Sequence, residues 1–262
     1  MPHAQVNGVG VYYEDHGSGL PLLLTHGYSS TGDMWRPQVE ALSGRYRVII
    51  WDMRGHGRTD SPGAPEAYSE ALTVADMCEL LRSLRVRRAV VGGHSLGGYM
   101  SLAFHMAHPE MVRALVLCDT GPGYRSDRAR AGWNEMAEAQ AGALEEKGLE
   151  ALGRSLEVTT VRHQQRSALG LALAARGVLA QHDSRVIDSL ASIAVPTLVV
   201  VGERDKLFLA ASDYMVSHIP GTRKVVVSDA GHAPNLEQPH AFNGALQTFL
   251  DSLGLEGDSE AP

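Results

Sequence analysis

The chain has 262 residues, of which 44% are apolar and 20% are charged, and its formal net charge is −7. This composition is typical of a globular protein with one sizeable core and excludes an intrinsically disordered chain. The acidic balance gives no basic footprint for nucleic acid, and no stretch reaches the ~20 apolar residues of a membrane span. We therefore expect a single domain without a nucleic-acid or membrane partner.

The predicted elements begin with a hairpin arm at residues 6–17, VNGVGVYYEDHG, where turn glycines accompany an alternating aromatic stretch. Apolar, β-branched runs then alternate with amphipathic helical stretches such as residues 73–84. Because each run is continuous rather than alternating, it predicts a strand buried on both faces. This order predicts an α/β fold with a mostly parallel, doubly wound sheet. The predicted strands lie at residues 20–27, 46–52, 89–94, 113–121, 196–205 and 223–232.

One interval breaks this alternation. From residue 125 to residue 194 the sequence is helix-prone and rich in Ala, Leu, Arg and Glu, with no strand-like run. A compact α/β domain needs no connection of this length, so we predict a helical cap inserted into a core of residues 1–124 and 195–254. The polar tail at residues 255–262 is predicted to be disordered.

The N-terminal stretch lacks the basic flank and the apolar core of a secretion signal. The two cysteines, Cys78 and Cys118, fall in different predicted elements and cannot form a disulfide framework. Both features predict a cytoplasmic location, where thiols stay reduced.

Chemically active side chains follow the predicted strands. In an open parallel sheet, ligands bind outside the carboxyl ends of the strands, so side chains at those ends should converge on one edge. They include a nucleophile, a candidate base and more than one carboxylate. The set is His26 with Gly27, Asp52, Ser95, Asp119, Asp205 and His232.

Residues 93–97, GHSLG, have the G-x-S-x-G pattern at a strand-to-helix junction. In a nucleophile elbow the serine occupies a strained turn, and the flanking glycines relieve the clash between strand and helix. Ser95 needs a base within reach, and His232 follows the last apolar run. Asp205 would hold the imidazole of His232 in the right tautomer. Asp119 also closes a strand and remains a second candidate for this acid.

Acyl transfer also requires fixed hydrogen-bond donors for the oxyanion. The backbone N–H of Leu96, at the start of the helix after Ser95, is one candidate. The N–H of Tyr28, where the strand ending in THG gives way to a loop, is the other. We expect His26 to brace this loop, and His94 to be buried and hydrogen-bonded.

Five segments of the chain resemble the α/β-hydrolase fold superfamily. A lone G-x-S-x-G occurs often by chance, but five segments in order with the right spacing are specific. The resemblance implies a catalytic triad of Ser95 as nucleophile, Asp205 as acid and His232 as base, with Tyr28 and Leu96 in the oxyanion hole. It also implies that the insertion is a cap. The segments are LLTHGYSS, DMRGHGRTD, GHSLGGYMSLAFHMAHPEMV, VVGERD and AGHAPNLEQP.

Within the superfamily, the motifs are most similar to small bacterial esterases and enol-lactone hydrolases, which implies a small-molecule ester or lactone substrate. Relatives that dehalogenate alkanes or open epoxides carry aspartate at the elbow, where this chain has Ser95. Relatives that cleave carbon–carbon bonds often carry tryptophan after the catalytic histidine, where this chain has Ala233. A carbon–carbon hydrolase, a thioesterase, a cofactor-free perhydrolase and a slow-turnover ligand sensor remain alternatives on the same triad.

The remaining residues predict an apolar pocket and no cofactor. His105 and His108 have a spacing that can bind metal, but no third ligand is nearby, and no nucleotide-binding glycine motif follows a strand. We therefore expect neither a metal nor an organic cofactor. Arg125, at the start of the cap, belongs to a solvated helix face or meets a substrate carboxylate. The predicted pocket residues are Trp35, Tyr99, Trp133 and Met136.

Overall fold

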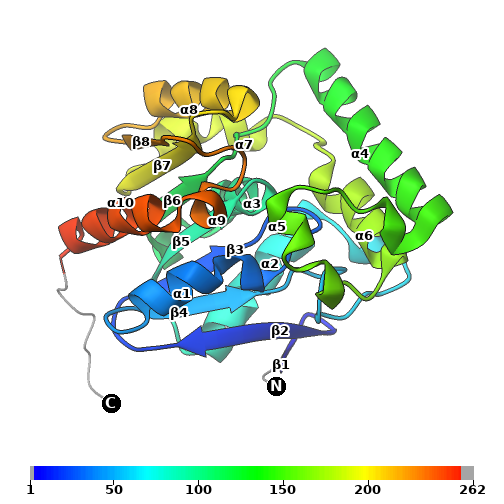
Figure 1. The fold of residues 1–262 in the computed structure, drawn as a ribbon, viewed down its shortest axis with the longest axis horizontal. Helices are drawn as coiled ribbons and strands as arrows, with labels where there is room; N and C mark the ends of the chain where they lie inside the picture. The colour runs from blue at the N-terminus through cyan, green and yellow to red at the C-terminus, as the bar shows by residue number, and fades with distance from the viewer. Residues whose placement is uncertain (1–2, 255–262) are drawn as a thin grey trace.

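The structure is a computed structural model that describes residues 3–254, and the tail predicted at residues 255–262 lies outside the described residues. A sheet with the strand order β1-β2-β4-β3-β5-β6-β7-β8 forms its centre (Figure 1). The strands are β1 (His3–Val6), β2 (Val9–His16), β3 (Pro21–Thr25), β4 (Arg47–Trp51), β5 (Ala89–His94), β6 (Val112–Cys118), β7 (Thr197–Gly202) and β8 (Arg223–Val227).

The sheet is parallel apart from the hairpin at its first edge. β1 and β2 pair antiparallel through a turn at Asn7 and Gly8, whose φ values are 45° and 80°. This is the type I′ geometry that an Asn-Gly pair favours in a two-residue hairpin. β2 joins β4 antiparallel, and every later pairing is parallel. The predicted hairpin arm and the mostly parallel α/β sheet are therefore confirmed.

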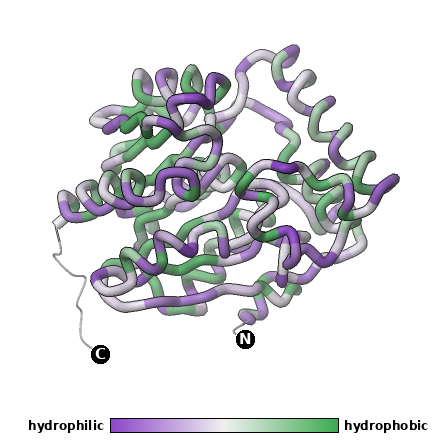
Figure 2. The backbone as a smooth tube through the Cα atoms, viewed as in Figure 1, coloured by the Kyte–Doolittle hydropathy of each residue, from purple (hydrophilic) through white to green (hydrophobic). Residues whose placement is uncertain are grey.

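Helices cover both faces of the sheet, because successive side chains of a strand point to opposite sides. In β3, Leu23 belongs to the apolar cluster that α2 and α3 cover, whereas Leu22 and Leu24 belong to the cluster that α1 and α10 cover. The central strands are accordingly hydrophobic along their length (Figure 2). The helices of the core are α1 (Arg36–Leu42), α2 (Glu70–Ser83), α3 (Leu96–Ala107), α8 (Lys206–His218), α9 (Pro234–Glu237) and α10 (Pro239–Ser252), with short 3-10 helices η1 (Gly32–Trp35), η2 (Pro65–Ala67) and η3 (Pro109–Met111).

Strand β8 differs from the prediction that it is buried on both faces. It is the last strand in the sheet and has a single neighbouring strand, β7. Val226 on β8 is 45% exposed. The sequence pattern of β8 resembles that of a central strand, but an edge position leaves one side of the strand without a partner and part of its apolar surface uncovered.

In the described chain, helices without strands occupy the interval between β6 and β7, where the sequence predicts the cap. Helix α4 (Asp127–Lys147) carries mixed polar and apolar side chains (Figure 2), and its Ala141 and Leu144 pack against Leu171 and Ala175 in a small separate cluster. No helix within residues 3–254 is long and apolar enough to cross a bilayer. The other helices here are η4 (Gly148–Ala151), α5 (Leu156–Thr159), η5 (Arg162–Gln164), α6 (Ala168–Ala174), the π-helix η6 (Ala175–Leu179), α7 (Arg185–Asp188) and η7 (Leu190–Ser192).

A buried ion pair fixes the loop after β4 to helix α2. Arg54 Nε and Nη2 donate to the two carboxylate oxygens of Asp76, each at 2.7 Å, and both side chains are at most 3% exposed. Asn7 Nδ2 also donates to Asp76, at 2.9 Å, so the hairpin arm joins the same network. Because both charges are removed from water, loss of either partner leaves the other uncompensated.

Replacing Arg54 with methionine should lower the free energy of unfolding by about 3–5 kcal/mol, because Asp76 would remain buried without its partner. Urea denaturation at pH 7, followed by circular dichroism, measures this change. The matched control is Arg82→Met, since Arg82 pairs with Glu79 at the surface and is 60% exposed. The control should change stability little. Equally small losses in both variants would contradict the role assigned to the buried pair.

Candidate active site

Ser95 occupies a tight turn between β5 and α3. Its backbone has φ 51° and ψ −117°, a conformation that side-chain-bearing residues rarely adopt. A Cβ atom on Gly93 would lie 2.2 Å from the carbonyl carbon of Gly97, and a Cβ atom on Gly97 would lie 2.2 Å from the carbonyl oxygen of Thr25. Only glycine fits these two positions, so the strand and the helix approach closely enough to hold Ser95 in the strained turn.

Hydrogen bonds from strand β6, from the residues after it and from α3 hold this turn in place. The Ser95 N–H donates to the carbonyl of Cys118 at 2.9 Å. The Ser95 carbonyl accepts the Thr120 hydroxyl at 2.6 Å and the Gly98 N–H at 3.0 Å. Thr120 lies 25 residues away along the chain, and no local sequence pattern indicates this contact.

The structure brings His232 and Asp205 together at the cavity that Ser95 lines. His232 Nδ1 and Asp205 Oδ2 are 2.6 Å apart, the distance of a charge-assisted hydrogen bond. Ser95 and His232 line the same cavity. Asp205 is the N-cap of α8, and its Oδ1 accepts the Phe208 N–H at 3.3 Å. Burial is the largest single effect on the pKa of Asp205 and would raise it, but the hydrogen bond with His232, the charge of that ring and the Phe208 N–H together lower the pKa.

Phe208 also fixes the plane of the imidazole. Its ring stacks on that of His232 with the centroids 5.0 Å apart and an angle of 25° between the planes. One residue near the start of α8 therefore contributes a backbone N–H to Asp205 and an aromatic face to His232. The sequence signal for Phe208 is its position three residues after Asp205, at the start of a helix, and our sequence analysis did not use it.

His94 connects the turn at Ser95 to the loop that carries His232. It is fully buried, and its Nε2–H donates to the backbone carbonyl of His232 at 2.5 Å. A carbonyl can only accept, so Nε2 carries the proton. Burial lowers the pKa of His94 to about 3, and the ring therefore stays neutral at pH 7. The prediction that His94 is buried and hydrogen-bonded is confirmed.

The rival carboxylate, Asp119, is fully buried and takes different partners. Its Oδ1 accepts the Gly202 N–H at 3.0 Å, and its Oδ2 lies 3.5 Å from the sulfur of Cys118. Burial, together with the nearby charge of Asp205, raises the pKa of Asp119 to about 9. The carboxylate that contacts the imidazole of His232 is therefore that of Asp205.

Among residues 3–254, the side chains of Asp119, Asp205 and His232 form the group that lies close enough together to hold a metal ion. One ligand atom each from Asp119, Asp205 and His232 lies within 4.8 Å of the others. His232 Nδ1 and Asp205 Oδ2 are in contact at 2.6 Å, so an ion bound between them would have to replace that hydrogen bond.

The two residues predicted to supply oxyanion donors line cavities that Ser95 also lines, Leu96 the first and Tyr28 the second. Leu96 is the first residue of α3, so its N–H has no acceptor within the helix and lies at the positive end of the helix dipole. Tyr28 follows β3 in a turn whose Gly27 carbonyl accepts the His26 Nδ1–H at 2.7 Å. His26 Nε2 in turn accepts the Met53 N–H at 2.9 Å. His26 thus braces this turn, and burial lowers its pKa to about 4, which keeps it neutral.

The segment between β6 and β7 contacts this turn directly. The Tyr28 hydroxyl donates to the carbonyl of Leu171 on α6 at 2.9 Å. The Ser30 hydroxyl donates to the carbonyl of Glu157 on α5 at 2.7 Å. Gln165 Nε2 donates to the carbonyl of Ser30 at 2.9 Å. Side-chain hydrogen bonds therefore join the loop after β3 to the segment between β6 and β7.

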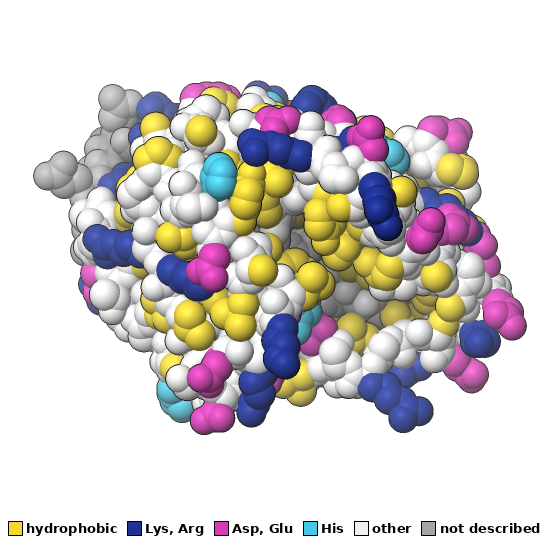
Figure 3. All heavy atoms as spheres, turned by 90° about the horizontal axis from the view of Figure 1, so that it is seen from above, with side chains coloured by type: hydrophobic (Ala, Val, Ile, Leu, Met, Phe, Trp, Pro, Cys, Tyr) yellow, Lys and Arg dark blue, Asp and Glu magenta, His cyan; other side chains and the backbone are white. Residues whose placement is uncertain are grey.

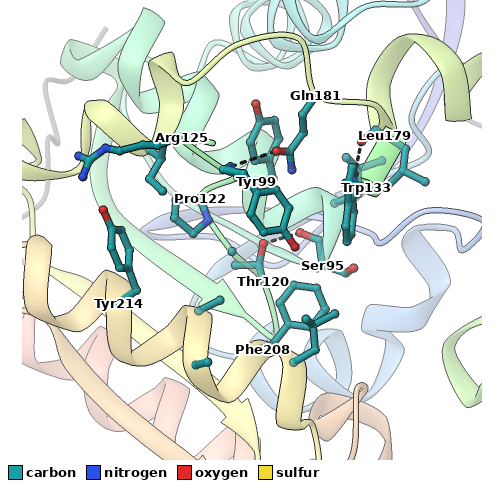
Figure 4. Close-up of a pocket in the computed structure, with 18 of the residues that line it drawn as sticks. Ser95, Tyr99, Thr120, Pro122, Arg125, Trp133, Leu179, Gln181, Phe208 and Tyr214 are labelled. Carbon is teal, nitrogen blue, oxygen red and sulfur yellow. Dashed lines mark hydrogen bonds between the residues drawn. The ribbon is translucent and has the colours of Figure 1, made fainter. Parts of the chain in front are cut away.

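Two cavities meet at Ser95. The first has a volume of about 410 Å³ and lies against α8, with the rings of Tyr99, Trp133, Phe208 and Tyr214 around it (Figure 4). The second, of about 890 Å³, runs along α4 toward α5. Both volumes are in the range of small-ligand sites. Figure 3 shows a hollow bordered by hydrophobic side chains on the face that carries α4 and α8.

Three of the four predicted pocket side chains line these cavities. Tyr99 lines the first, Met136 lines the second, and Trp133 lines both. The Trp133 indole donates to the carbonyl of Leu179 at 2.8 Å, which fixes its ring between the two cavities. Gln181, which no local sequence pattern indicates, also lines the first cavity, and its Oε1 accepts the Tyr124 N–H at 3.2 Å.

The prediction for Trp35 is wrong. Trp35 is fully buried, lines neither cavity, and packs against Phe242 of α10 with a ring separation of 6.0 Å. It ends the 3-10 helix η1, which turns the indole into the core between the sheet and α10. Trp35 is near Tyr28 in sequence, but this does not determine whether its side chain faces the cavities or the core.

Arg125 does not face the substrate space. Its Nε donates to Asp188 Oδ1 at 2.6 Å, and Figure 4 shows the guanidinium directed away from Ser95. Arg125 is among the residues that line the first cavity, where its guanidinium carbon lies 6.0 Å from the ring centroid of Tyr214. The guanidinium therefore belongs to a surface ion pair, as the first of the two sequence interpretations proposed.

The chain is similar to known hydrolases over nearly its whole length. A family model described as the alpha/beta hydrolase family matches residues 22–245. The 3-oxoadipate enol-lactonase 1 of Acinetobacter baylyi is 30% identical, over 84% of each chain. The structure of a thermophilic esterase from Thermogutta terrifontis is 29% identical over 94% of each chain, with a TM-score of 0.83. The enol-lactonase from Burkholderia xenovorans LB400 is 26% identical, with a TM-score of 0.78, over 95% of this chain and 100% of that one.

If the contact of Asp205 with His232 serves catalysis, Asp205→Asn should lower kcat by about 10⁴-fold, because the amide favours the wrong imidazole tautomer. Asp119→Asn should lose much less, since Asp119 does not bond to the ring. Steady-state kinetics on a chromogenic ester at pH 7 compares the two variants, with thermal melting as the control for folding. A larger loss for Asp119→Asn would assign the acid to Asp119.

Proposed function

Because this chain belongs to the alpha/beta hydrolase family, we propose that it hydrolyses a carboxylic ester or a lactone through an acyl-enzyme on Ser95. The observation that carries this proposal is the 2.6 Å hydrogen bond between His232 and Asp205 at the cavity that Ser95 lines. The named relatives support the substrate class, since they include an enol-lactonase and an esterase.

In the proposed reaction, His232 Nε2 takes the proton of the Ser95 hydroxyl as the oxygen attacks the substrate carbonyl. Asp205 holds Nδ1–H and stabilises the imidazolium that forms. The imidazolium then protonates the leaving alkoxide, and the alcohol departs. Water attacks the resulting acyl-enzyme with His232 again as the base. The carboxylic acid leaves, and Ser95 regains its proton.

The oxyanion of each tetrahedral intermediate is stabilised by the N–H groups of Leu96 and Tyr28. Preorganised donors of this kind lower the barrier by about 3 kcal/mol each. The bonds of His26 to Gly27 and Met53 support the proposed role of Tyr28, because they hold the turn in place before substrate binds. The helix dipole of α3 adds partial positive charge at Leu96.

We infer that residues 125–194 form a cap over this site and divide the substrate space in two. The cavity against α8 and the cavity along α4 both reach Ser95. The carbonyl carbon of an ester carries an acyl chain on one side and an alcohol group on the other. Each of the two cavities accommodates one of these groups. The apolar rings around the first cavity favour an uncharged hydrocarbon group there.

The first test is hydrolysis of graded p-nitrophenyl esters and a panel of lactones, with Ser95→Ala as the blank. Turnover should depend on Ser95, and the Ser95→Ala substitution should reduce kcat by about 10⁶-fold. Normal turnover by a folded Ser95→Ala protein would exclude this mechanism. Labelling of Ser95 by a fluorophosphonate without turnover of any ester or lactone would favour a ring-fission product, a thioester or a signalling ligand instead.

Filling one cavity at a time should separate the two substrate groups. Ala211 of α8 lines the first cavity and Ala143 of α4 lines the second. Ala211→Phe and Ala143→Phe should each lower kcat/KM by about 10–200-fold for long chains in the cavity that they fill. The measurement uses two ester series, one lengthened in the acyl part and one in the alcohol part. If both variants lose the same series, the division of the substrate is wrong.

A further inference from the structure

Two aspartate side chains and the imidazole of His232 lie together at the end of the sheet. One side-chain ligand atom each from Asp119, Asp205 and His232 lies within 4.8 Å of the others. Two carboxylates this close repel each other when both are ionised, which raises the pKa of one of them. One of the two carboxyl groups therefore carries a proton.

The surroundings of each carboxyl group decide which one is protonated. Asp205 accepts hydrogen bonds from the imidazole and from the Phe208 N–H, and both stabilise a negative charge. Asp119 is fully buried and meets one backbone N–H and the weakly donating thiol of Cys118. No Lys, Arg or His of residues 3–254 lies within ion-pair distance of Asp119. A buried carboxyl group without a cation keeps its proton.

We propose that Asp119 is a positioning residue, a neutral carboxylic acid that donates a hydrogen bond to the Asp205 carboxylate and holds it toward His232. This inference rests on the proposed function, in which His232 is the base. The donated bond satisfies lone pairs of Asp205 that would otherwise be desolvated without a partner. Asp119 touches neither Ser95 nor the cavities, and it acts through Asp205.

The proposal predicts a change at alkaline pH. With a pKa of about 9, Asp119 is neutral at pH 7 and ionises as the pH rises through that value. Ionisation removes the donor and places a second negative charge beside Asp205, so kcat should fall. The titratable groups that face Asp119 are Asp205, His232 and Cys118. Burial raises the pKa of Cys118 well above its usual range, so the thiol stays protonated over this interval.

The test compares Asp119→Asn with Asp119→Gly, because both residue types tolerate the positive φ of 41° at this position. Asparagine keeps an N–H donor that does not titrate, whereas glycine removes the donor. At pH 7, kcat of Asp119→Gly should be about 10–100-fold below that of the wild type, with little change in KM. The kcat of Asp119→Asn should lie much closer to the wild-type value. The decline of kcat near pH 9 should be present in the wild type and absent from Asp119→Asn. Equal alkaline declines in both proteins would overturn the proposal.

A second measurement does not depend on turnover or on the folding of the glycine variant. Carboxyl ¹³C NMR of the aspartate-labelled wild type should show one carboxyl group that titrates near pH 9 and is missing from Asp119→Asn. Absence of any aspartate that titrates above pH 7 would overturn the proposal. Wild-type protein that lacks Ser95-dependent turnover but shows this high-pH carboxyl group would contradict the proposed function and leave the protonation of Asp119 established.

Discussion

The close approach of helix α3 to strand β3 is the constraint on which the site depends. Gly97 lies against the carbonyl oxygen of Thr25, with no space for a Cβ atom between them. This contact forces the chain at Ser95 into its strained turn and brings the first N–H of α3 beside the loop after β3. A looser packing of strand and helix would separate Leu96 from Tyr28 and relax Ser95 at once.

Around this contact, neutral buried side chains align the parts of the site by hydrogen bonds. His94 reaches the loop of His232, His26 reaches the loop after β4, and Thr120 connects β6 to the Ser95 turn. None of the three carries a charge at neutral pH, since burial lowers the pKa of both histidines. Asp205, by contrast, has a lowered pKa and is charged at neutral pH.

The sequence predicted the sheet, the hairpin and the residues at the strand ends, because these depend on local patterns: hydrophobic runs, an Asn-Gly turn and glycines around Ser95. Prediction from the sequence failed for features that depend on packing between residues distant in the chain. Trp35 follows the turn after β3 in sequence but is buried under α10, and the contact of Thr120 with Ser95 joins separate strands. The choice between Asp119 and Asp205 also required the structure, since both acids close a parallel strand and only their partners distinguish them.

The hydrogen bonds between the loop after β3 and the proposed cap at residues 125–194 limit how this segment can be exchanged. Tyr28, Ser30 and Gln165 join the two through backbone carbonyl groups, those of Leu171 on α6, Glu157 on α5 and Ser30 in the loop. A cap transplanted from a relative would bring its own backbone to these positions and leave the donors of this loop unmatched. A functional chimera would therefore have to carry residues 28–31 together with the helices between β6 and β7. Two segments that are distant in sequence would thus have to be exchanged together when substrate specificity is transferred.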